Sequence, residues 1–220
     1  MHEGQRRMGA HFHPDIVMDI EPMGPSLPDY DRKDYAPVHA RFARQIERLK
    51  GAGADFFLCP DNTAHMALEA EGPPFALPGL HIQSIVAAEA KRRGFKKVGV
   101  TGTRWTMEGP VYPREFAVAG IASLAPDAQD RADVQSIIMD ELVQGVFLET
   151  SRACFVDVVG RLAREGCDSV VLGCTELPMI LNDETSPVPT LASTQLLAIA
   201  AVNVALGDAP MPTWRGGPRQ

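Results

Sequence analysis

The sequence predicts an α/β fold with a mainly parallel sheet. Short runs rich in Val, Ile, Leu and Phe alternate along the chain with segments whose apolar residues recur at helical spacing. Strands joined by helical segments run parallel in most folds, because each helix carries the chain back along the sheet. The composition agrees with a globular protein, since 45% of the 220 residues are hydrophobic and 22% are charged.

The first half of the chain contains three predicted strands. A β-rich run at residues 16–20 is followed by a segment rich in Pro, Gly and Asp at residues 21–35, which predicts a long loop. A helix is predicted at residues 37–50, because its apolar residues lie three or four positions apart and glycines follow it. Apolar runs at residues 55–59 and 80–82 predict the next two strands.

The second half repeats this alternation with more elements. A helix ends in three basic residues before Gly94, a charge pattern that favours a helix C-terminus. Turn residues separate the runs that follow. The predicted strands lie at residues 98–101, 121–124, 169–172 and 189–191, and the predicted helices at residues 130–144, 151–165 and 194–206.

Charge and hydropathy argue against two classes of partner. The chain has 21 basic and 28 acidic residues, a formal net charge of −7, and no long basic block, so nucleic acid is not expected as a partner. No apolar run approaches the roughly 20 residues of a membrane-spanning helix, so no membrane partner is expected. The first residues lack the apolar stretch of a signal peptide, which favours a cytoplasmic protein.

Four cysteines raise the question of thiol chemistry. They are Cys59, Cys154, Cys167 and Cys174, and no pair has the spacing of a C-x-x-C motif or a zinc site. We therefore predict free thiols and no bound metal. Cys154 falls within a predicted helix and Cys167 in a turn before a strand, so both are interpreted as packing residues.

A gapless internal repeat at an offset of 113 residues relates the two halves, with Gly53 matching Gly166. The same offset places Asp61 on Cys174, and both follow the carboxyl end of a predicted strand, where parallel sheets bind ligands. The repeat predicts two copies of one α/β unit with a cleft between them, although helix–glycine–strand units also match by chance in α/β proteins. The counterpart of strand 98–101 would precede residue 1, so the first copy is expected to lack its N-terminal strand.

Four short motifs stand out along the chain. Asn62-Thr63-Ala64-His65 follows one predicted strand, and Gly173-Cys174-Thr175-Glu176-Leu177 follows another. The stretches at residues 98–108 and 140–145 complete the set. Together these motifs resemble the aspartate/glutamate/hydantoin racemase superfamily, and within it the amino-acid racemase branch, with matches over about residues 15–206.

This resemblance implies a fold of two pseudo-symmetric parallel-sheet α/β domains with the active site between them. The first domain is expected at residues 1–90 plus 190–208, and the second at residues 91–189. Residues 209–220 are rich in Pro and Gly and predict a mobile tail. The resemblance further implies an enzyme that uses no cofactor, binds a small amino acid or related carboxylate, and forms a homodimer.

The resemblance also implies the residues that carry the chemistry. In the family two cysteines flank the substrate α-carbon, and one removes a proton while the other returns one to the opposite face. Cys174 matches one of them, and Asp61 stands where the other is usually found. The substrate contacts implied by the motifs are Asn62, Thr63, Thr103, Thr175 and Glu176.

Two departures from the family pattern bear on the reaction. Asp61 has two interpretations, a catalytic base and an N-cap of the following helix, and these roles can coexist. Because the reference pKa of a carboxyl group is near 4 and that of a thiol near 8.5, Asp61 would be the base and Cys174 the acid. Val146 stands where the family commonly has a lysine for the distal carboxylate, which argues against a substrate with an acidic side chain.

Three further residues are weaker candidates for the site. Cys59 lies two residues before Asp61, but Pro60 interrupts the strand geometry between them. His65 either lines the site or lies on a helix surface, and Arg32 belongs to the loop after the first predicted strand, from which it could reach a substrate carboxylate.

The leading functional hypothesis is a cofactor-independent amino-acid racemase or epimerase that works between Asp61 and Cys174. Two alternatives stay open. A decarboxylase of malonate-type acids, or an isomerase, would use the same scaffold with one-sided proton delivery. A non-catalytic ligand-binding homologue would retain the scaffold without turnover.

Overall fold

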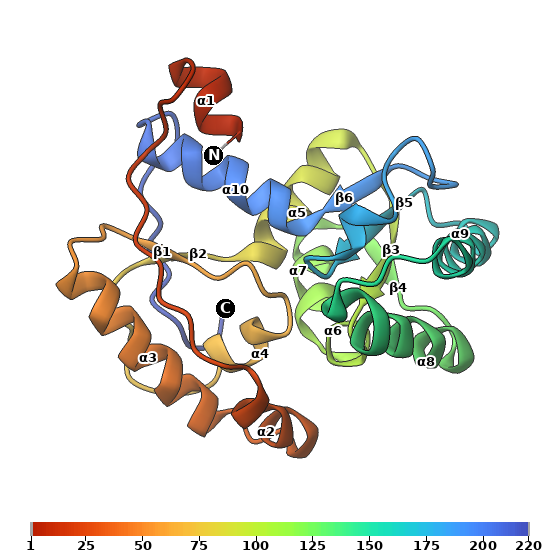
Figure 1. Cartoon of the computed structure of the whole chain (residues 1–220), viewed down its shortest axis with the longest axis horizontal. Coiled ribbons are helices and arrows are strands. Elements are labelled where there is room, and N and C mark those ends of the chain that lie inside the picture. Colours follow the sequence, from red (N-terminus) through yellow and green to blue (C-terminus); the bar gives the residue numbers. More distant parts are fainter. Residues whose placement is uncertain (1, 220) are drawn as a thin grey trace. The chain divides into compact units, whose positions relative to one another are not determined.

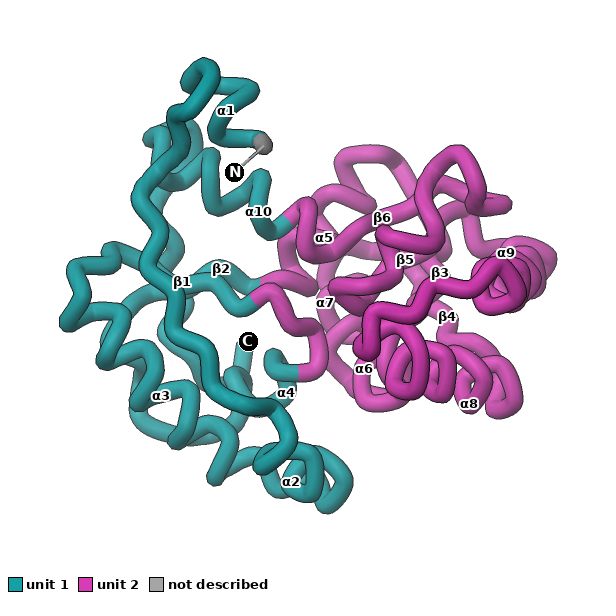
Figure 2. The backbone as a smooth tube through the Cα atoms, in the orientation of Figure 1, with its two compact units in different colours: residues 1–59, 64–81, 197–220 teal, residues 60–63, 82–196 magenta. Residues whose placement is uncertain are grey.

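The computed structural model describes residues 2–219 and divides into two compact units (Figure 2). Unit 1 comprises Met1–Cys59, Ala64–His81 and Leu197–Gln220. Unit 2 comprises Pro60–Thr63 and Ile82–Leu196. Each unit contains parallel strands with helices around them, as the alternating pattern of the sequence predicts.

Unit 1 is built around a short parallel pair, β1 (Phe57–Leu58) and β2 (Gly79–Leu80). The long helix α3 (Ala36–Gly51) presents one apolar face to this pair, and Ile46 packs with Phe57 in a buried cluster. The remaining helical elements of this unit are α1 (His2–Met8), η1 (Gly24–Ser26), α2 (Leu27–Arg32), α4 (Ala64–Leu68) and the part of α10 (Ser193–Ala205) that begins at Leu197.

The predicted strand at residues 16–20 does not form, although the chain there is extended, and neither sheet of residues 2–219 includes it. Asp19 ties the segment to α3, because its carboxylate accepts hydrogen bonds from Arg48 at 2.5 Å and Gln45 at 3.2 Å. The apolar side chains face outward, with Met18 73% and Ile20 80% exposed. A strand requires a neighbouring strand for its backbone hydrogen bonds, so β-propensity alone is not sufficient.

The structure also differs from the prediction at residues 21–35, where the helical segments η1 and α2 lie within the expected loop. Pro25 and Pro28 lie near the start of these segments, where a missing N–H costs nothing and the fixed φ favours helical geometry. Lys33 ends α2 in the left-handed conformation, with φ of 58°.

The C-terminal segment packs against unit 1, in contrast to the mobile tail expected at residues 209–220. The Gly79 N–H donates to the Trp214 carbonyl at 2.7 Å, and the Phe75 N–H donates to the Arg215 carbonyl at 2.7 Å. The Trp214 ring lies against His81 at a centroid distance of 4.9 Å, and Phe57 is a further ring neighbour. A composition rich in Pro and Gly did not reveal this docking, because the contacts come from residues more than a hundred positions away.

Replacement of Trp214 with alanine is expected to lower the free energy of unfolding by about 2 kcal/mol. This is less than the cost of truncating a fully buried aromatic side chain, because the Trp214 indole is only half-buried. In thermal unfolding this corresponds to a decrease in Tm of about 4–8 °C. Met211→Ala is the control, because Met211 lies on the same segment and is exposed. A Trp214→Ala protein with the Tm of the Met211→Ala protein would contradict the docking.

Unit 2 contains a four-stranded parallel sheet in the order β4-β3-β5-β6 (Figure 1). The strands are β3 (Lys97–Gly102), β4 (Ala122–Leu124), β5 (Ser169–Gly173) and β6 (Thr190–Ala192). The helical elements are α5 (Ile82–Arg93), α6 (Arg104–Glu108), α7 (Val111–Ala119), α8 (Ala128–Ser136), η2 (Ile137–Glu141), η3 (Leu142–Gln144), α9 (Glu149–Arg164) and η4 (Leu177–Met179). The single helix predicted at residues 130–144 is therefore three consecutive helical segments.

Both faces of this sheet are covered, as the mainly apolar residues of its central strands require. Along β5, Val170 and Leu172 point into a cluster formed with α8 and α9, while Val171 points into a second cluster formed with α5 and α7. Figure 1 shows the strands between these two helical layers. All five residues of β5 are buried, so the chemistry of this unit can occur only where its strands end.

Two glycines bring the ends of β3 and β5 into close contact. Gly102 pairs with Gly173, and a Cβ atom on Gly173 would lie 2.5 Å from the Thr101 carbonyl oxygen. The absence of side chains at these two positions allows the backbones to approach. As a result, Thr103 and Cys174 leave the sheet from neighbouring strand ends.

The strand order agrees with the internal repeat. In unit 1, β1 is followed by α4 and pairs with β2, and in unit 2, β5 is followed by η4 and pairs with β6. The offset places Phe57 on Val170 and Ala64 on Leu177, which occupy corresponding positions in these two strand–turn–helix segments.

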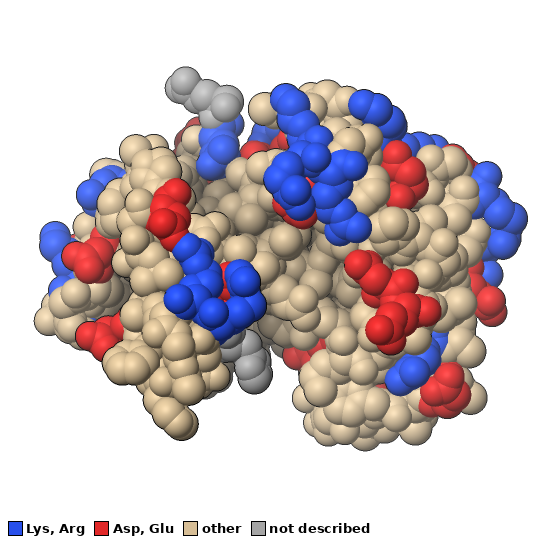
Figure 3. Space-filling view, turned by 90° about the horizontal axis from the view of Figure 1, so that it is seen from above, with Lys and Arg blue, Asp and Glu red and all other residues tan. Residues whose placement is uncertain are grey.

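On the face drawn in Figure 3, basic and acidic side chains lie in small separate groups rather than in one continuous basic field. Among residues 2–219 every helix is too short or too polar to cross a bilayer.

Candidate active site

Three buried threonine hydroxyls form the centre of the candidate site in unit 2. The Thr63 hydroxyl lies 2.8 Å from that of Thr103 and 3.2 Å from that of Thr106. Thr103 is also the N-cap of α6, where its oxygen accepts a hydrogen bond from the Thr106 N–H. The structure therefore brings together two of the predicted contacts, Thr63 and Thr103, and adds Thr106 to them.

Asn62 precedes Thr63 in the chain, and both the nitrogen and the oxygen of its side-chain amide form hydrogen bonds. Its Nδ2 donates to the Ser193 hydroxyl at 2.9 Å, and its Oδ1 accepts from the Tyr112 hydroxyl at 2.7 Å. The Gln83 side chain donates to the Asn62 carbonyl oxygen at 2.9 Å. These bonds attach the loop Pro60–Thr63 to the ends of β5 and β6 and to helices α5 and α7.

Cys174 follows directly after β5 and its thiol is only partly accessible. The thiol donates a hydrogen bond to Oε2 of Glu176 at 2.9 Å. Burial raises the pKa of Cys174 to about 12, and the Glu176 carboxylate and the more distant charge of Asp61 act in the same direction. The thiol therefore carries its proton at neutral pH.

Asp61 is half-buried at the start of the same loop. Its Oδ1 accepts a hydrogen bond from the Thr63 N–H at 2.8 Å, which closes an Asx turn. The Asp61 charge also raises the pKa of Cys174, but its effect is smaller than those of burial and of Glu176. The pairing of Asp61 with Cys174 in the site stays a prediction of the internal repeat.

Thr175 and Glu176, predicted as substrate contacts, interact with each other, and Glu176 also interacts with the thiol. Thr175 is exposed and donates from its hydroxyl to Oε2 of Glu176 at 2.6 Å. One carboxylate oxygen thus accepts from both Thr175 and Cys174. In this arrangement Glu176 is a hydrogen-bond acceptor for the catalytic candidate.

The three weaker candidates all belong to unit 1. Cys59 packs against its apolar cluster, and His65 is fully buried against the rings of His81 and Trp214. Arg32 is exposed and pairs with Asp29 on the same helix at 2.5 Å. Each of them has structural contacts of its own within that unit.

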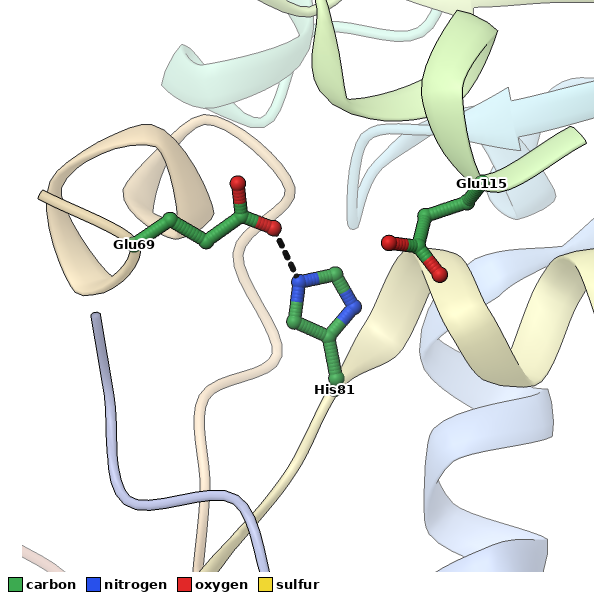
Figure 4. Close-up of side chains that lie close together, drawn as sticks. All are labelled: Glu69, His81 and Glu115. Carbon is green, nitrogen blue, oxygen red and sulfur yellow. Dashed lines mark hydrogen bonds and ion pairs between the residues drawn. The ribbon is translucent and has the colours of Figure 1, made fainter. Parts of the chain in front are cut away.

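A buried ion pair in unit 1 had no signal in the sequence. Nε2 of His81 lies 2.5 Å from Oε1 of Glu69, and both side chains are almost inaccessible (Figure 4). Glu69 follows α4 and His81 follows β2, so only the fold brings them together. A carboxylate and an imidazole are both common metal-ligand types.

The other partners that sequence reasoning missed are Thr106, Tyr112, Ser193 and Gln83. Ser193 follows the end of β6, so the rule that ligands bind at carboxyl ends of parallel strands could have found it. Thr106 lies one helical turn after Thr103. Tyr112 and Gln83 lie on helices far along the chain and had no local signal.

Cys154 and Cys167 have the environment expected of packing residues. Both contact the apolar cluster under β5, and burial raises the pKa of each thiol. All four cysteines are free thiols, as the spacing predicted.

The thiol of Cys174 is expected to react slowly with iodoacetamide, because the thiolate is the reactive form and a pKa of about 12 keeps it scarce. Its alkylation rate should rise about tenfold per pH unit up to pH 10, whereas a thiol with a reference pKa levels off above about pH 9. Peptide mass spectrometry of the native protein over time measures the rate at each cysteine.

Glu176→Gln should accelerate this alkylation at pH 8, since it removes a negative charge that raises the pKa of Cys174. Glu184→Gln is the matched control, because Glu184 is exposed on the following loop. A Cys174 rate that levels off by pH 9 would show that its pKa is not raised.

A family model described as Asp/Glu/Hydantoin racemase matches residues 1–201 of this chain. The chain belongs to the Asp/Glu/hydantoin racemase family. This membership confirms the resemblance seen in the strand-end motifs.

Individual members of the Asp/Glu/hydantoin racemase family support the same assignment. The chain is 26% identical over 159 residues to the broad specificity amino-acid racemase RacX of Bacillus subtilis (strain 168), which covers 72% of this chain and 68% of that protein. It superposes with a TM-score of 0.80 and 29% identity on a crystal structure from Yersinia pestis assigned to the Asp/Glu racemases, with 93% and 90% of the two chains covered.

A crystal structure of an aspartate racemase homologue from Pyrococcus horikoshii OT3 shows the same fold, with a TM-score of 0.75, 22% identity and 92% and 88% of the two chains covered. The predicted fold class, a parallel-sheet α/β architecture of the aspartate/glutamate racemase type, is therefore confirmed.

Proposed function

We propose that this protein is a cofactor-independent racemase or epimerase that moves a proton at the carbon α to a carboxylate, with Asp61 and Cys174 on opposite faces of that carbon. The observation that carries the proposal is the placement of Cys174 directly after β5 and of Asp61 on the loop that carries the buried Thr63 hydroxyl, which lies 2.8 Å from the hydroxyl of Thr103 after β3. The family of the chain and its racemase relatives give independent support.

In one direction the Asp61 carboxylate takes the α-proton, and the electron pair of the broken C–H bond moves onto the α-carbon and the substrate carboxylate. The Cys174 thiol then gives its proton to the opposite face, which leaves a thiolate and a protonated Asp61. The reverse direction exchanges these roles and restores the starting state. The raised pKa of Cys174 suits the role of proton donor in the first direction.

Glu176 is the group that assists the thiol in the reverse direction. Its carboxylate accepts the Cys174 hydrogen bond at 2.9 Å, and its negative charge raises the pKa of the thiol, so the thiolate left by the first direction is a stronger base for the reverse direction. The hydroxyls of Thr63, Thr103 and Thr106 supply donors for the negative charge that develops on the substrate carboxylate. Because these groups are already ordered and buried, little reorganisation is needed when that charge forms.

The substrate side chain is proposed to be uncharged. Val146 stands where a lysine would bind a distal carboxylate, and the stretch around it exposes Val143, Phe147 and Leu148. A carboxylate side chain would find no cation from this stretch. An apolar or small polar side chain is therefore the better match.

The test incubates single enantiomers of the common amino acids with the protein in D₂O. Proton NMR follows loss of the α-proton signal, and chiral chromatography follows the appearance of the other enantiomer. Deuterium incorporation with inversion for at least one amino acid is the expected result. No exchange with any of them would contradict the proposal.

A second candidate is a decarboxylase of malonate-type acids, favoured by the single thiol with a pKa of about 12, which suits delivery of one proton to an enolate. Loss of carbon dioxide from the substrate breaks a C–C bond, and the thiol proton forms the new C–H bond. Release of carbon dioxide from arylmalonates, without exchange of amino-acid α-protons, would favour this candidate over the racemase.

A further inference from the structure

A chain of four hydrogen-bonding groups crosses the interior of unit 2 beside the candidate site. It runs from the Tyr112 hydroxyl to Asn62 Oδ1, from Asn62 Nδ2 to the Ser193 hydroxyl, and from that hydroxyl to the Leu172 carbonyl at 2.9 Å. Tyr112 and Ser193 are fully buried, and Asn62 is 3% exposed. A network of this kind is stabilising only when every member is satisfied.

The direction of each bond follows from the number of protons available. The Ser193 hydroxyl has one proton, and it donates that proton to the Leu172 carbonyl. It must therefore accept from Asn62, so the NH₂ end of the amide faces Ser193 and the carbonyl end faces Tyr112. If the amide were flipped, Ser193 would have to donate its proton to Asn62, and the buried Leu172 carbonyl would lose its hydrogen bond. The free-energy cost would be that of a buried unsatisfied polar group.

This orientation has a consequence for ligand binding. The Asn62 amide has two N–H groups, and Ser193 takes one of them. The other has no acceptor among the described residues, although the amide is almost completely buried. The network thus fixes the orientation of one N–H group that no described residue accepts.

The same series of hydrogen bonds connects the segments next to the two proposed reacting residues, Asp61 and Cys174. Leu172 lies two residues before Cys174 on β5, and Asn62 follows Asp61 directly. Burial raises the pKa of Tyr112 far above its ordinary value, so its hydroxyl remains a neutral donor. Ser193 and Tyr112 therefore tie the loop that carries Asp61 to the strand that carries Cys174.

We propose that Tyr112 and Ser193 are positioning residues that lock the Asn62 amide in one orientation, with its second N–H directed to a carboxylate of the ligand. This role rests on the proposed function only for the identity of the ligand. The lock itself is a property of the protein without ligand.

The experiment uses the full-length protein with ¹⁵N-labelled asparagine and compares Tyr112→Phe and Ser193→Ala with wild type. Asn62→Asp identifies the Asn62 amide signals by their loss. Wild type should show two unequal amide protons that exchange slowly with solvent, and each variant should accelerate this exchange at least about tenfold. The matched controls are Tyr35→Phe, whose hydroxyl contacts only the Met66 sulfur at 3.5 Å, and Ser169→Ala, a buried hydroxyl without a hydrogen-bond partner in residues 2–219.

The kinetic arm measures α-proton exchange with the amino acid that wild type exchanges fastest. Tyr112→Phe and Ser193→Ala should raise KM by about tenfold with a smaller effect on kcat, because a substrate contact is misplaced while the acid and base remain. Ser193→Thr retains the hydroxyl and should restore both the amide signals and KM. The two control variants should have the KM of wild type.

Asn62 amide signals in Tyr112→Phe and Ser193→Ala that match wild type would overturn the lock. Altered signals with an unchanged KM would overturn the positioning role. If wild type exchanges no α-proton, the amide arm still decides the lock, and acetate serves as the carboxylate probe. A shift of the second Asn62 N–H on addition of acetate would then support the directed donor and contradict only the proposed reaction, whereas no shift would overturn the donor as well.

Discussion

Replacement of Cys174 with alanine is expected to abolish racemisation in both directions, with a loss of at least about a thousandfold. In the direction that begins at Asp61, no thiol proton remains to quench the carbanion, and in the other direction no base remains on that face. The stability should change little, because the Cys174 side chain is only partly buried at the edge of its cluster. Chiral chromatography and ¹H NMR in D₂O measure the two directions separately.

Cys154→Ala is the matched control for this variant. Cys154 contacts the same apolar cluster as Cys174, and burial raises the pKa of its thiol as well, but it lies on α9. It should retain wild-type exchange. A Cys174→Ala protein with more than about a tenth of wild-type activity would show that the reaction does not pass through this thiol.

Replacement of Asp61 with asparagine should stop racemisation and leave one-sided exchange. The base that serves one enantiomer is lost, with a decrease of about 10²–10⁴-fold for that enantiomer. Cys174, assisted by Glu176, still faces the other enantiomer and should exchange its α-proton with retention of configuration. The amide oxygen of asparagine can accept the Thr63 N–H, so the turn at the start of the loop should persist.

The rescue variant for this experiment is Asp61→Cys, which restores an ionisable group at the same position. It should recover racemisation in both directions, since a thiol there is the arrangement implied by the family resemblance. Equal losses for both enantiomers in Asp61→Asn, with the Tm unchanged, would contradict the assignment of Asp61 to one face.

Much of the secondary structure of this protein could be predicted from local patterns. Helix α3 and strand β5 appear where apolar spacing placed them, because a helix face and a buried strand each impose a short-range periodicity on the sequence. Prediction was wrong at residues 16–20, where the residue types favour a strand but no strand lies alongside. It was also wrong at residues 21–35, where two prolines begin helical segments in place of a loop.

Some residues of the candidate site could be predicted from the sequence, and others could not. Asn62, Thr63 and Cys174 could be recognised from motifs that follow strands, since the ends of parallel strands are where such folds carry ligands. Their partners could not, because Tyr112 lies 50 positions and Ser193 lies 131 positions from Asn62. No local pattern encodes a hydrogen bond over such separations.

The sequence by itself determined the α/β class, most of the strands and helices, the family and the motifs that contain Asp61 and Cys174, because all of these depend on short motifs and periodicity. Only the tertiary structure decided the protonation of Cys174, the orientation of the Asn62 amide and the docking of Trp214. Each of these depends on burial and on partners distant in sequence. Desolvation and hydrogen-bond direction are properties of the packed interior, and they exist only after the chain has folded.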